Sequence, residues 1–421
     1  MTKRNNCYVI GAGLYGCLTA WKIKKKNPEK NVSLIDTSDH IISVFDPISI
    51  DGIEINNGFH GIELPRAQAL SDFIKNELGL DLKEEKNIKK MIIDGCIVDY
   101  TDRLHQYPCR IKNFFRDTGR QVGSKDDLLD LLSDDFRVIL KRISSRYSDD
   151  FDSVSHLLIP WYCPADFVIK SHDEGDIFRN GVRLREIDPW YAWPPSYLFQ
   201  EIQPAFESAL KKINVEILLS TKVNFSDDGI RLSSDDKRPP QIDLDKDTIF
   251  LCMPPIGILR HVSENIFSDL VAKPHDLYNV LLSGTSMDGC IPFTEILCCD
   301  PEVVPLSRIS RHRVKNPTET FLQLELFSSP QLNIGDDTTD MLIEYINRVM
   351  PSLGYKDFRL NGLQKTRKVY FPNKQVTDAA LSVVRSWSNR FPNIKILESF
   401  GPINMAKTWL YSEMNLDFIN K

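Results

Sequence analysis

The chain has 421 residues, of which 42% are hydrophobic and 26% are charged, and its formal net charge is −6. This length exceeds what one hydrophobic core usually serves, so we expect two or three packed domains. The acidic balance argues against a nucleic-acid partner, and no apolar run approaches the roughly 20 residues of a membrane span.

The first residues of the chain and the spacing of its cysteines and histidines narrow the class of protein further. The first expected strand follows Met1 within a few residues and leaves no room for a signal peptide, so a cytoplasmic protein is predicted. The nine cysteines and eight histidines show no metal-ligand spacing, so no metal site is predicted. Whether two chains pair as a homodimer stays open.

The most informative motif lies in residues 7–36, where an apolar strand, a Gly-x-Gly-x-x-Gly turn, a helix and a second strand follow one another. This order is typical of a dinucleotide site. Gly11 permits the tight turn, Gly13 lets the backbone approach a diphosphate, and Gly16 lets the helix pack closely on the sheet. Asp36, about 20 residues further on, is placed to bind a ribose 2′-hydroxyl and argues against a 2′-phosphate. The predicted nucleotide-binding set is Gly11, Gly13, Leu14, Tyr15, Gly16 and Asp36.

Short strands and a helix are expected after this unit. Residues 46–57 alternate isoleucine with polar residues and predict a strand pair that turns at an Asp-Gly pair. The glycines near His60 let the backbone approach a planar ligand. A helix is expected over residues 66–78 and a second strand pair over 91–107.

The middle of the chain is predicted to hold an inserted region. Residues 126–171 carry apolar residues at helical spacing, and the stretch up to residue 193 is typical of a cap or substrate domain. A cluster of aromatic residues either stacks on a nucleobase or sugar ring or forms a core between domains: Trp190, Tyr191, Trp193 and Tyr197. A helix over 194–210 and strands at 215–219 and 247–253 follow, and the last strand returns the chain to the nucleotide-binding sheet.

The last third of the chain predicts a second sheet. Residues 288–326 are mostly strand-like and suit a mixed or antiparallel sheet, and helical periodicity returns at 339–350 and 376–390. Three arginines lie along one expected strand and are predicted to share one face: Arg308, Arg311 and Arg313. Such a row either grips phosphate or carboxylate or forms a solvated basic edge.

Together these motifs resemble the FAD-binding flavoproteins of the amine oxidase and protoporphyrinogen oxidase superfamily, and within it most closely UDP-galactopyranose mutase and its relatives. The resemblance rests on the N-terminal glycine turn, a return strand that ends in Met-Pro-Pro, and a final helix after a glycine. It implies an FAD cofactor. It also implies an α/β fold, in which a Rossmann-like doubly wound FAD-binding domain is joined to a mixed-sheet and helical substrate domain.

The same resemblance implies roles for single residues. Gly58, Phe59 and His60 match a Gly-x-His segment that lies against the isoalloxazine in the family. His60 is the catalytic candidate, which either donates a hydrogen bond to flavin or substrate or fills the turn. The remaining cofactor-binding candidates are Val223, Gly401 and Met405. The substrate-binding candidates are Arg308, Trp193 and Tyr107, with Arg308 gripping an anionic part of the substrate.

The resemblance also divides the chain into five segments. Residues 1–90 and 194–262 are expected to form the FAD-binding domain, and residues 91–193 a helical cap or substrate region. Residues 263–375 are expected to form the substrate-domain sheet, and residues 376–421 helices that close over the flavin.

The function predicted from the sequence is an FAD-dependent oxidation or reduction of a small molecule bound between two domains. The substrate is expected to be polar, and sugar-like or nucleotide-linked. A redox-neutral rearrangement of a nucleotide sugar, as in the mutases, is the first alternative. A flavin-fold binding subunit without catalysis is the second. It stays open because the family's Gly-Gly after the ribose carboxylate is replaced near Ile42-Ser43, and because Pro402 stands where the mutases have arginine.

Overall fold

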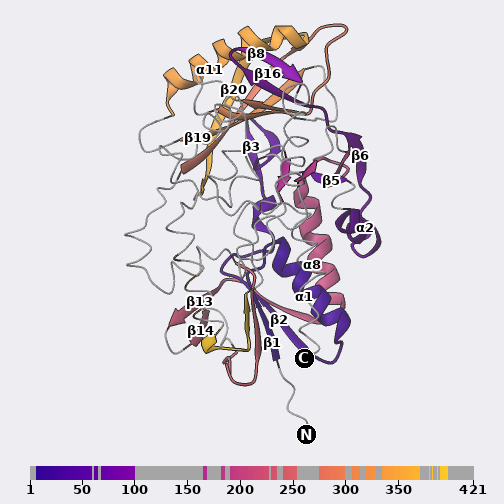
Figure 1. The fold of residues 1–421 in the computed structure, drawn as a ribbon, viewed down its shortest axis with the longest axis vertical. Coiled ribbons are helices and arrows are strands. Elements are labelled where there is room, and N and C mark those ends of the chain that lie inside the picture. Colours follow the sequence, from indigo (N-terminus) through magenta and orange to yellow (C-terminus); the bar gives the residue numbers. More distant parts are fainter. Residues whose placement is uncertain are drawn as a thin grey trace, which may run out of the picture.

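Two main sheets lie at opposite ends of the computed structural model, with a narrow two-stranded ribbon between them (Figure 1). A seven-stranded sheet lies at the top of that view and a five-stranded sheet at the bottom. The structure describes residues 6–58, 61–64, 68–99, 165–167, 182–184, 190–226, 229–234, 240–253, 275–298, 306–312, 319–328, 334–369 and 391–396, with single positions between 379 and 390.

The five-stranded sheet is parallel and has the order β12-β2-β1-β15-β21. Its strands are β1 (Asn6–Ile10), β2 (Asn31–Ile35), β12 (Val215–Leu218), β15 (Thr248–Leu251) and β21 (Ile394–Ile396). Consecutive residues of β1 are buried, as expected of a central parallel strand covered on both faces. The chain adds strands on the β2 side of β1 first and on the β15 side later, so the carboxyl end of β1 lies at a topological switch point. Ligands bind at such points in open α/β sheets.

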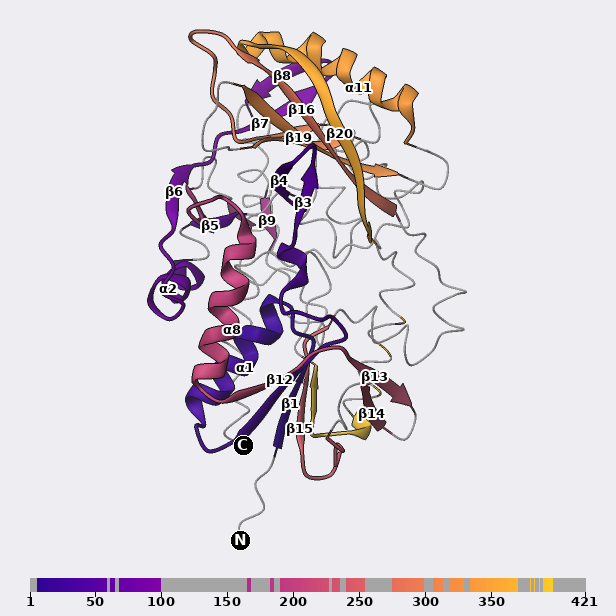
Figure 2. The same ribbon diagram turned by 180° about the vertical axis from the view of Figure 1, so that it is seen from behind.

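Helices cover one face of the parallel sheet and a hairpin covers the other. α1 (Leu14–Lys26) and α8 (Ile202–Lys212) run side by side, as Figure 2 shows from behind. Their apolar side chains share one core with β1, β2 and the short helix α2 (Gln68–Asn76). On the opposite face, β13 (Thr221–Ser226) and β14 (Gly229–Ser234) pack against a second, smaller cluster.

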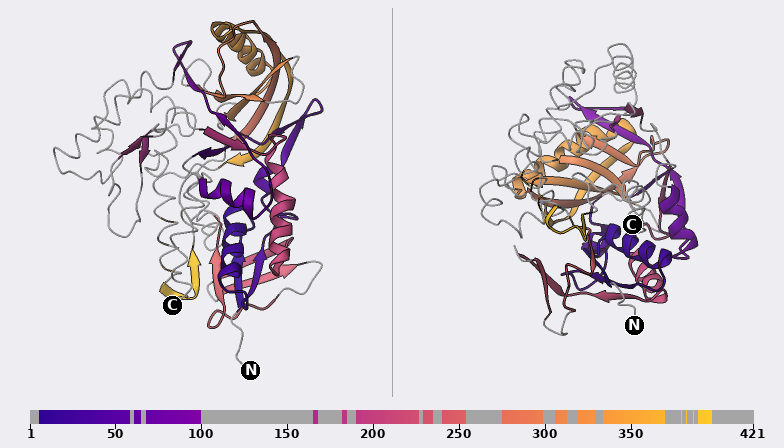
Figure 3. Two further views of the ribbon diagram at one scale, coloured as in Figure 1. Left: turned by 90° about the vertical axis from the view of Figure 1, so that its right-hand side faces the viewer. Right: turned by 60° about the horizontal axis from the view of Figure 1, so that its bottom comes forward.

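The seven-stranded sheet is mixed and has the order β20-β16-β19-β18-β17-β7-β8. Its strands are β7 (Lys89–Ile93), β8 (Cys96–Asp99), β16 (His275–Ser286), β17 (Glu295–Cys298), β18 (Leu306–His312), β19 (Thr320–Ser328) and β20 (Tyr355–Val369). Every neighbouring pair is antiparallel except β7 with β17. α11 (Asp336–Val349) and the 3-10 turn η7 (Met350–Leu353) cover one face of this sheet (Figure 3).

Short elements connect the two ends. β3 (Pro47–Ile50) pairs with β4 (Ile53–Asn56), and this ribbon packs on β16 through Ile55 and Leu281. A three-stranded sheet has the order β5-β11-β6, formed by Ile62–Leu64, Trp190–Trp193 and Lys83–Lys86. The remaining elements are β9 (Ala165–Phe167), which pairs with β10 (Val182–Leu184), and the 3-10 turns η1 (Ser43–Phe45) and η5 (Phe199–Glu201).

Asn56, the last residue of β4, ties these parts together. Its side chain donates to the carbonyl of Tyr197 at 2.8 Å and accepts from the N–H of Phe199 at 3.0 Å. Its own carbonyl accepts from the Gln323 amide at 2.9 Å. One residue therefore joins the ribbon, the segment that leads into α8, and the seven-stranded sheet.

The predicted α/β class with a Rossmann-like domain is confirmed, as are the hairpin in 46–57, the helix in 66–78 and the late return strand. The described part of the strand-like stretch 288–326 contains β17, β18 and most of β19 of the mixed sheet. The helix expected from residue 194 begins only at Ile202, because residues before it form a turn with Tyr197 at φ +66°.

The strand pair expected over residues 91–107 is present in its described part, because β7 and β8 turn at Asp94-Gly95 and belong to the seven-stranded sheet. Strands also lie in regions expected to be helical, since β9, β10 and β11 fall within 91–193. β21 lies within 376–421 and completes the parallel sheet. β11 and β21 pair with strands distant in sequence, which local periodicity does not reveal. The expected final helix lies outside the described residues.

Candidate functional site

The glycine turn between β1 and α1 has the close packing that its spacing predicted. Gly11 has φ +104°, and a Cβ there would lie 2.7 Å from the carbonyl oxygen of Cys252. A Cβ on Gly16 would lie 1.7 Å from the carbonyl oxygen of Gly11. Both positions therefore need glycine: the first for its conformation and the second because helix and turn are in backbone contact.

Gly13 differs from its two neighbours because it faces open space. It is the N-cap of α1, with φ −65° and ψ 176°, and no atom of the described residues lies within 4 Å of a Cβ built there. The N–H groups of the first helical turn and the positive end of the helix dipole point to this space. The position therefore suits an anion such as a diphosphate.

Asp36 follows the last residue of β2 and closes the other side of the turn. One carboxylate oxygen accepts from the Ala12 N–H at 2.5 Å and the other accepts from the Ser38 N–H at 2.8 Å. Each carboxylate oxygen has a further lone pair, so Asp36 can hold the turn and still accept a ribose hydroxyl. The residues of this turn fit the diphosphate and ribose of an adenine dinucleotide.

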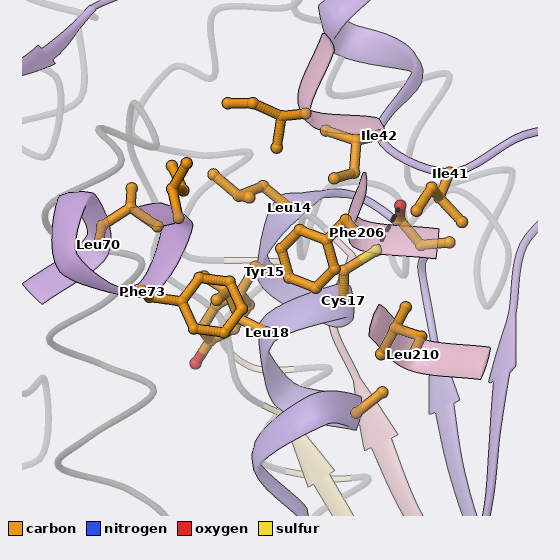
Figure 4. Packing of buried hydrophobic residues seen from close by; sticks show 14 of the residues in the cluster. Leu14, Tyr15, Cys17, Leu18, Ile41, Ile42, Leu70, Phe73, Phe206 and Leu210 are labelled. Carbon is orange, nitrogen blue, oxygen red and sulfur yellow. Dashed lines mark hydrogen bonds between the residues drawn. The ribbon is translucent and has the colours of Figure 1, made fainter. Parts of the chain in front are cut away.

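The loop after Asp36 packs across the turn. Ile42 has φ 52°, and its N–H donates to the Ala12 carbonyl at 2.8 Å. Its side chain is buried with Ile41, Leu14 and Phe206, as Figure 4 shows. A β-branched residue rarely adopts positive φ, so packing on every side must hold this conformation.

His40 and Gln203 form side-chain hydrogen bonds that hold the same loop in place. The His40 ring lies between Asp39 and Asp46, with Nε2 2.7 Å from Asp46 Oδ2. Gln203 of α8 donates to the Ile42 carbonyl at 3.0 Å and to Asp46 at 2.8 Å. Partial burial acts to lower the pKa of His40, but its hydrogen bonds to Asp46 and Asp39 outweigh burial and raise that pKa.

The other predicted cofactor residues occupy different surroundings. Leu14 and Tyr15 are 8% exposed and pack in the core beside α1 (Figure 4), so they present backbone rather than side chain to the turn. Val223 lies in β13 and is buried against the other face of the parallel sheet. Several candidates lie outside the described residues: Phe59, His60, Tyr107, Gly401 and Met405.

One face of the seven-stranded sheet is polar although it is buried. Along β19, Leu322, Leu324 and Leu326 pack with the cluster around α11, while Gln323 and Glu325 alternate with them and face the other way. Gln323 is 4% exposed and Glu325 7%. Buried polar groups are costly unless they are paired, so this face needs a structural or functional reason.

Four charged residues on this face form a row that we call the charge ladder: Lys89, Glu295, Arg308 and Glu325. Lys89 Nζ lies 3.3 Å from Glu295 Oε1, and Arg308 Nε lies 3.6 Å from Glu295 Oε2. Arg308 Nη1 lies 3.8 Å from Glu325 Oε1. Burial acts to raise the pKa of Glu295, but Lys89 and Arg308 outweigh it and hold that pKa below its usual value. Glu295 is therefore an ionised carboxylate inside the protein.

Gly58 brings the predicted flavin turn to this ladder. It has φ +96°, and a Cβ there would lie 3.9 Å from a carboxylate oxygen of Glu325. At the end of the same turn, a Cβ on Gly61 would lie 2.2 Å from the ring of Tyr191. Tyr191 in turn accepts a hydrogen bond from Lys89 at 3.2 Å. Gly58 thus lies beside the polar face, and Gly61 lies against β11.

The substrate-binding candidates are only partly brought together. Arg308 belongs to the charge ladder. Trp193 is 4% exposed and stacks on Tyr191 at 5.5 Å between ring centroids, so it lies in the core behind the Lys89 contact. The structure makes this pair part of a buried core and leaves the stacking role of Trp193 a prediction.

The predicted arginine row is wrong for its two described members. Arg308 faces the charge ladder, whereas Arg311 packs over the ring of Tyr355, 5.9 Å from its centroid, on the α11 side of the sheet. Residues three apart in a strand point to opposite faces, which explains the difference. Arg313 lies outside the described residues.

Sequence reasoning missed Lys89, Glu295 and Glu325. A signal was present, since Gln323 and Glu325 alternate with three leucines in the sequence. That pattern fits an ordinary exposed face, and only the pairing of β7, β17, β18 and β19 shows that the charges meet.

The described residues contain neither a membrane-spanning helix nor a metal-binding group. None of their helices has the length and apolar character needed to cross a bilayer. Within the same residues, no group of three or more His, Cys, Asp or Glu side chains is arranged to hold a metal ion.

Comparison with known proteins supports the class of fold. Residues 9–76 match the family of NAD(P)-binding Rossmann-like domains, which covers the turn, α1 and Asp36. No curated protein sequence matches the chain. The fold is therefore that of a Rossmann-like, dinucleotide-binding α/β protein.

Particular solved structures share this fold over almost the whole chain. A fatty acid isomerase from P. acnes that produces CLA has a TM-score of 0.62 at 13% identity, covering 99% of each chain. Reduced UDP-galactopyranose mutase has a TM-score of 0.61 at 14% identity, covering 93% of this chain and 89% of that one. Putrescine oxidase bound to putrescine has a TM-score of 0.59 at 12% identity, covering 99% of each chain. The expected α/β fold with a Rossmann-like domain is confirmed, and the three structures resemble this chain to a similar degree, so a specific likeness to the mutase is not established.

Proposed function

We propose that this protein is an FAD-dependent oxidoreductase that acts on a polar small molecule. The observation that carries the proposal is the open Gly13 at the N-terminus of α1, with Asp36 beside it at the switch point of a parallel sheet. The carboxylate of Asp36 disfavours a 2′-phosphate, which favours FAD or NAD over NADP. The likeness to an amine oxidase and a mutase over nearly the full chain supports FAD.

In this proposal each end of the molecule has one task. The N–H groups at Gly13 bind the diphosphate, and Asp36 accepts a ribose hydroxyl while it holds the Ala12 N–H. FAD, when bound, supplies the two-electron transfer, and the surrounding protein groups set its orientation and local charge. The polar face beside Gly58 binds and orients the substrate, and His60 donates a hydrogen bond to substrate or flavin.

A redox-neutral mutase is the second candidate, favoured by the likeness to UDP-galactopyranose mutase over 93% of this chain. Turnover separates the two candidates. An oxidoreductase consumes an electron acceptor in proportion to the substrate converted, whereas a mutase converts substrate without consuming one. A third candidate, a binding subunit, is favoured by Ile42 in the place of a family glycine and predicts bound flavin without turnover of any substrate.

The substitution Gly13→Asp tests the nucleotide site. Its backbone angles suit any residue, and aspartate is a good N-cap, so the FAD-free chain should be as stable as wild type or gain about 0.5 kcal/mol or less. The carboxylate would occupy the place of the diphosphate, so FAD should bind at least about a hundredfold more weakly. Calorimetric titration of FAD and flavin absorbance measure this directly.

Gly335→Asp is the matched control. Gly335 is the N-cap of α11 and also has no described atom within 4 Å of a built Cβ. This variant should bind FAD like wild type. The proposal fails if Gly13→Asp retains FAD, or if wild-type protein refuses FAD and binds NAD in its place.

A further inference from the structure

The charge ladder crosses four adjacent strands of the sheet. Lys89 of β7 is the direct partner of Glu295 of β17, and Arg308 of β18 is the direct partner of Glu325 of β19. Arg308 reaches Glu295 on the diagonal, 3.6 Å away. The charges therefore alternate in sign along the row, and each lies within 4 Å of an opposite charge.

The ladder is neutral as a whole and mostly buried. The side chains of Lys89 and Glu295 are each 6% exposed, that of Glu325 is 10% exposed, and that of Arg308 is 29% exposed. Arg308 is thus the most accessible member, and Gly58 lies next to the Glu325 end. A ligand bound beside Gly58 would meet a guanidinium donor and a carboxylate acceptor together.

The polar row continues beyond the charges. Asn279 of β16 is the direct partner of Glu325, and Gln364 of β20 is the direct partner of Asn279. Gln323 donates to Asn279 at 2.7 Å. The Oε1 atom of Gln364 is buried without a hydrogen-bond partner among the described residues. Hydrogen-bond donors and acceptors therefore continue across the polar face of the sheet, from the charged side chains of the ladder to the amide side chains on β16 and β20.

We propose that the charge ladder binds a net-neutral, hydroxyl-rich group of the substrate and discriminates against an anionic one. This inference rests on the proposed function, because it names the substrate class of the same site. The positive charge of Arg308 already has two carboxylates as neighbours, so an anion that approached it would add a third negative charge to a buried place. A hydroxyl can donate to Glu325 and accept from Arg308, which leaves the charges of the ladder balanced.

Two sugars with the same ring test the proposal on the full-length wild-type chain. D-Glucose and D-glucuronate differ at C6, where the second carries a carboxylate. Calorimetric titration should show glucose binding at least about tenfold more tightly than glucuronate. Tighter binding of glucuronate would overturn the proposal, and so would the absence of binding by both sugars.

Charge-changing variants test the reason for the preference. Glu325→Gln keeps the shape of the side chain and gives the ladder a net positive charge, so the preference should shift toward glucuronate by about tenfold or more. Arg311→Gln removes a positive charge from β18, on the opposite face of the sheet, and should leave the preference for glucose over glucuronate unchanged. An unchanged preference in Glu325→Gln would contradict the proposal.

The readout separates this inference from the proposed function. Heat of sugar binding does not depend on flavin colour. If the chain does not bind FAD but binds glucose more tightly than glucuronate, the proposed oxidoreductase function is contradicted and the proposed selectivity of the charge ladder is supported. A chain that binds FAD but prefers glucuronate would do the reverse.

Discussion

The candidate sites at the two ends of the molecule are built in different ways. At the parallel sheet, the candidate site is built from backbone: a glycine turn, a helix N-terminus and one carboxylate that holds an N–H. At the seven-stranded sheet, the candidate site is built from four charged side chains on four strands. The first kind of site suits a cofactor shared by many enzymes, whereas the second can be varied residue by residue to select a substrate.

The largest expected effect comes from breaking the charge ladder. Lys89→Met leaves the buried carboxylate of Glu295 without its direct partner and should lower the free energy of unfolding by about 3–5 kcal/mol. The double variant Lys89→Met, Glu295→Leu removes both charges and should be less destabilised than Lys89→Met alone. Urea unfolding of the FAD-free chain measures both, and a double variant that costs the sum of two large single losses would show that the pair is not coupled.

The next largest effect lies at the glycine turn. Gly16→Ala would place a Cβ 1.7 Å from the Gly11 carbonyl oxygen, so helix and turn must separate, at a cost of about 3 kcal/mol. Gly13→Ala, three residues away in open space, should change stability by about 0.5 kcal/mol or less. Thermal unfolding compares the two. Equal stability of both variants would mean that the turn is not packed as described.

A smaller effect is expected at the joint between the two ends. Asn56→Ala removes the partners of the Tyr197 carbonyl and the Phe199 N–H and should cost about 2 kcal/mol. Asn224→Ala on the exposed face of β13 should cost about 0.5 kcal/mol or less. Hydrogen exchange of the segment leading into α8 should rise in the first variant only. Unchanged exchange there would show that Asn56 does not couple the parts.

The smallest effects are pH dependences of opposite sign at the two ends. The raised pKa of His40 means that its contribution to stability is present below its ordinary pKa and is lost as pH rises through the raised value. His312 is half-buried in β18, and burial lowers its pKa to about 4, so the folded protein loses stability as pH falls below the ordinary pKa of histidine.

Urea midpoints across pH should therefore change in opposite directions in two variants. His40→Gln should reduce the loss of stability that occurs as pH rises, and His312→Gln should reduce the loss of stability that occurs as pH falls. A variant with the same pH profile as wild type would show that its histidine does not contribute.

The sequence predicted most of the nucleotide end because its determinants are contiguous. Gly11, Gly13, Gly16 and Asp36 lie within one short unit, and each constrains backbone that is local in sequence. The packing of Ile42 across this turn could not be predicted, because its positive φ depends on contacts with α8 and the core.

The polar face could be predicted only in part. Arg308 was singled out, but its neighbours lie on other strands, and Lys89 of β7 precedes the other three members of the charge ladder by more than 200 residues. Their meeting depends on strand order and register, which local periodicity does not contain. The error over Arg311 has a different cause, because residues three apart in a strand point to opposite faces and this spacing is already visible in the sequence.

A crystal structure of the full-length chain grown with FAD tests the central claim most directly. The account predicts the diphosphate at the N–H groups of Gly13, a ribose hydroxyl on Asp36, and the flavin ring beside Gly58 and the charge ladder. Crystals without FAD, in which the Ile41–Ile42 segment fills the space over the glycine turn, would contradict it.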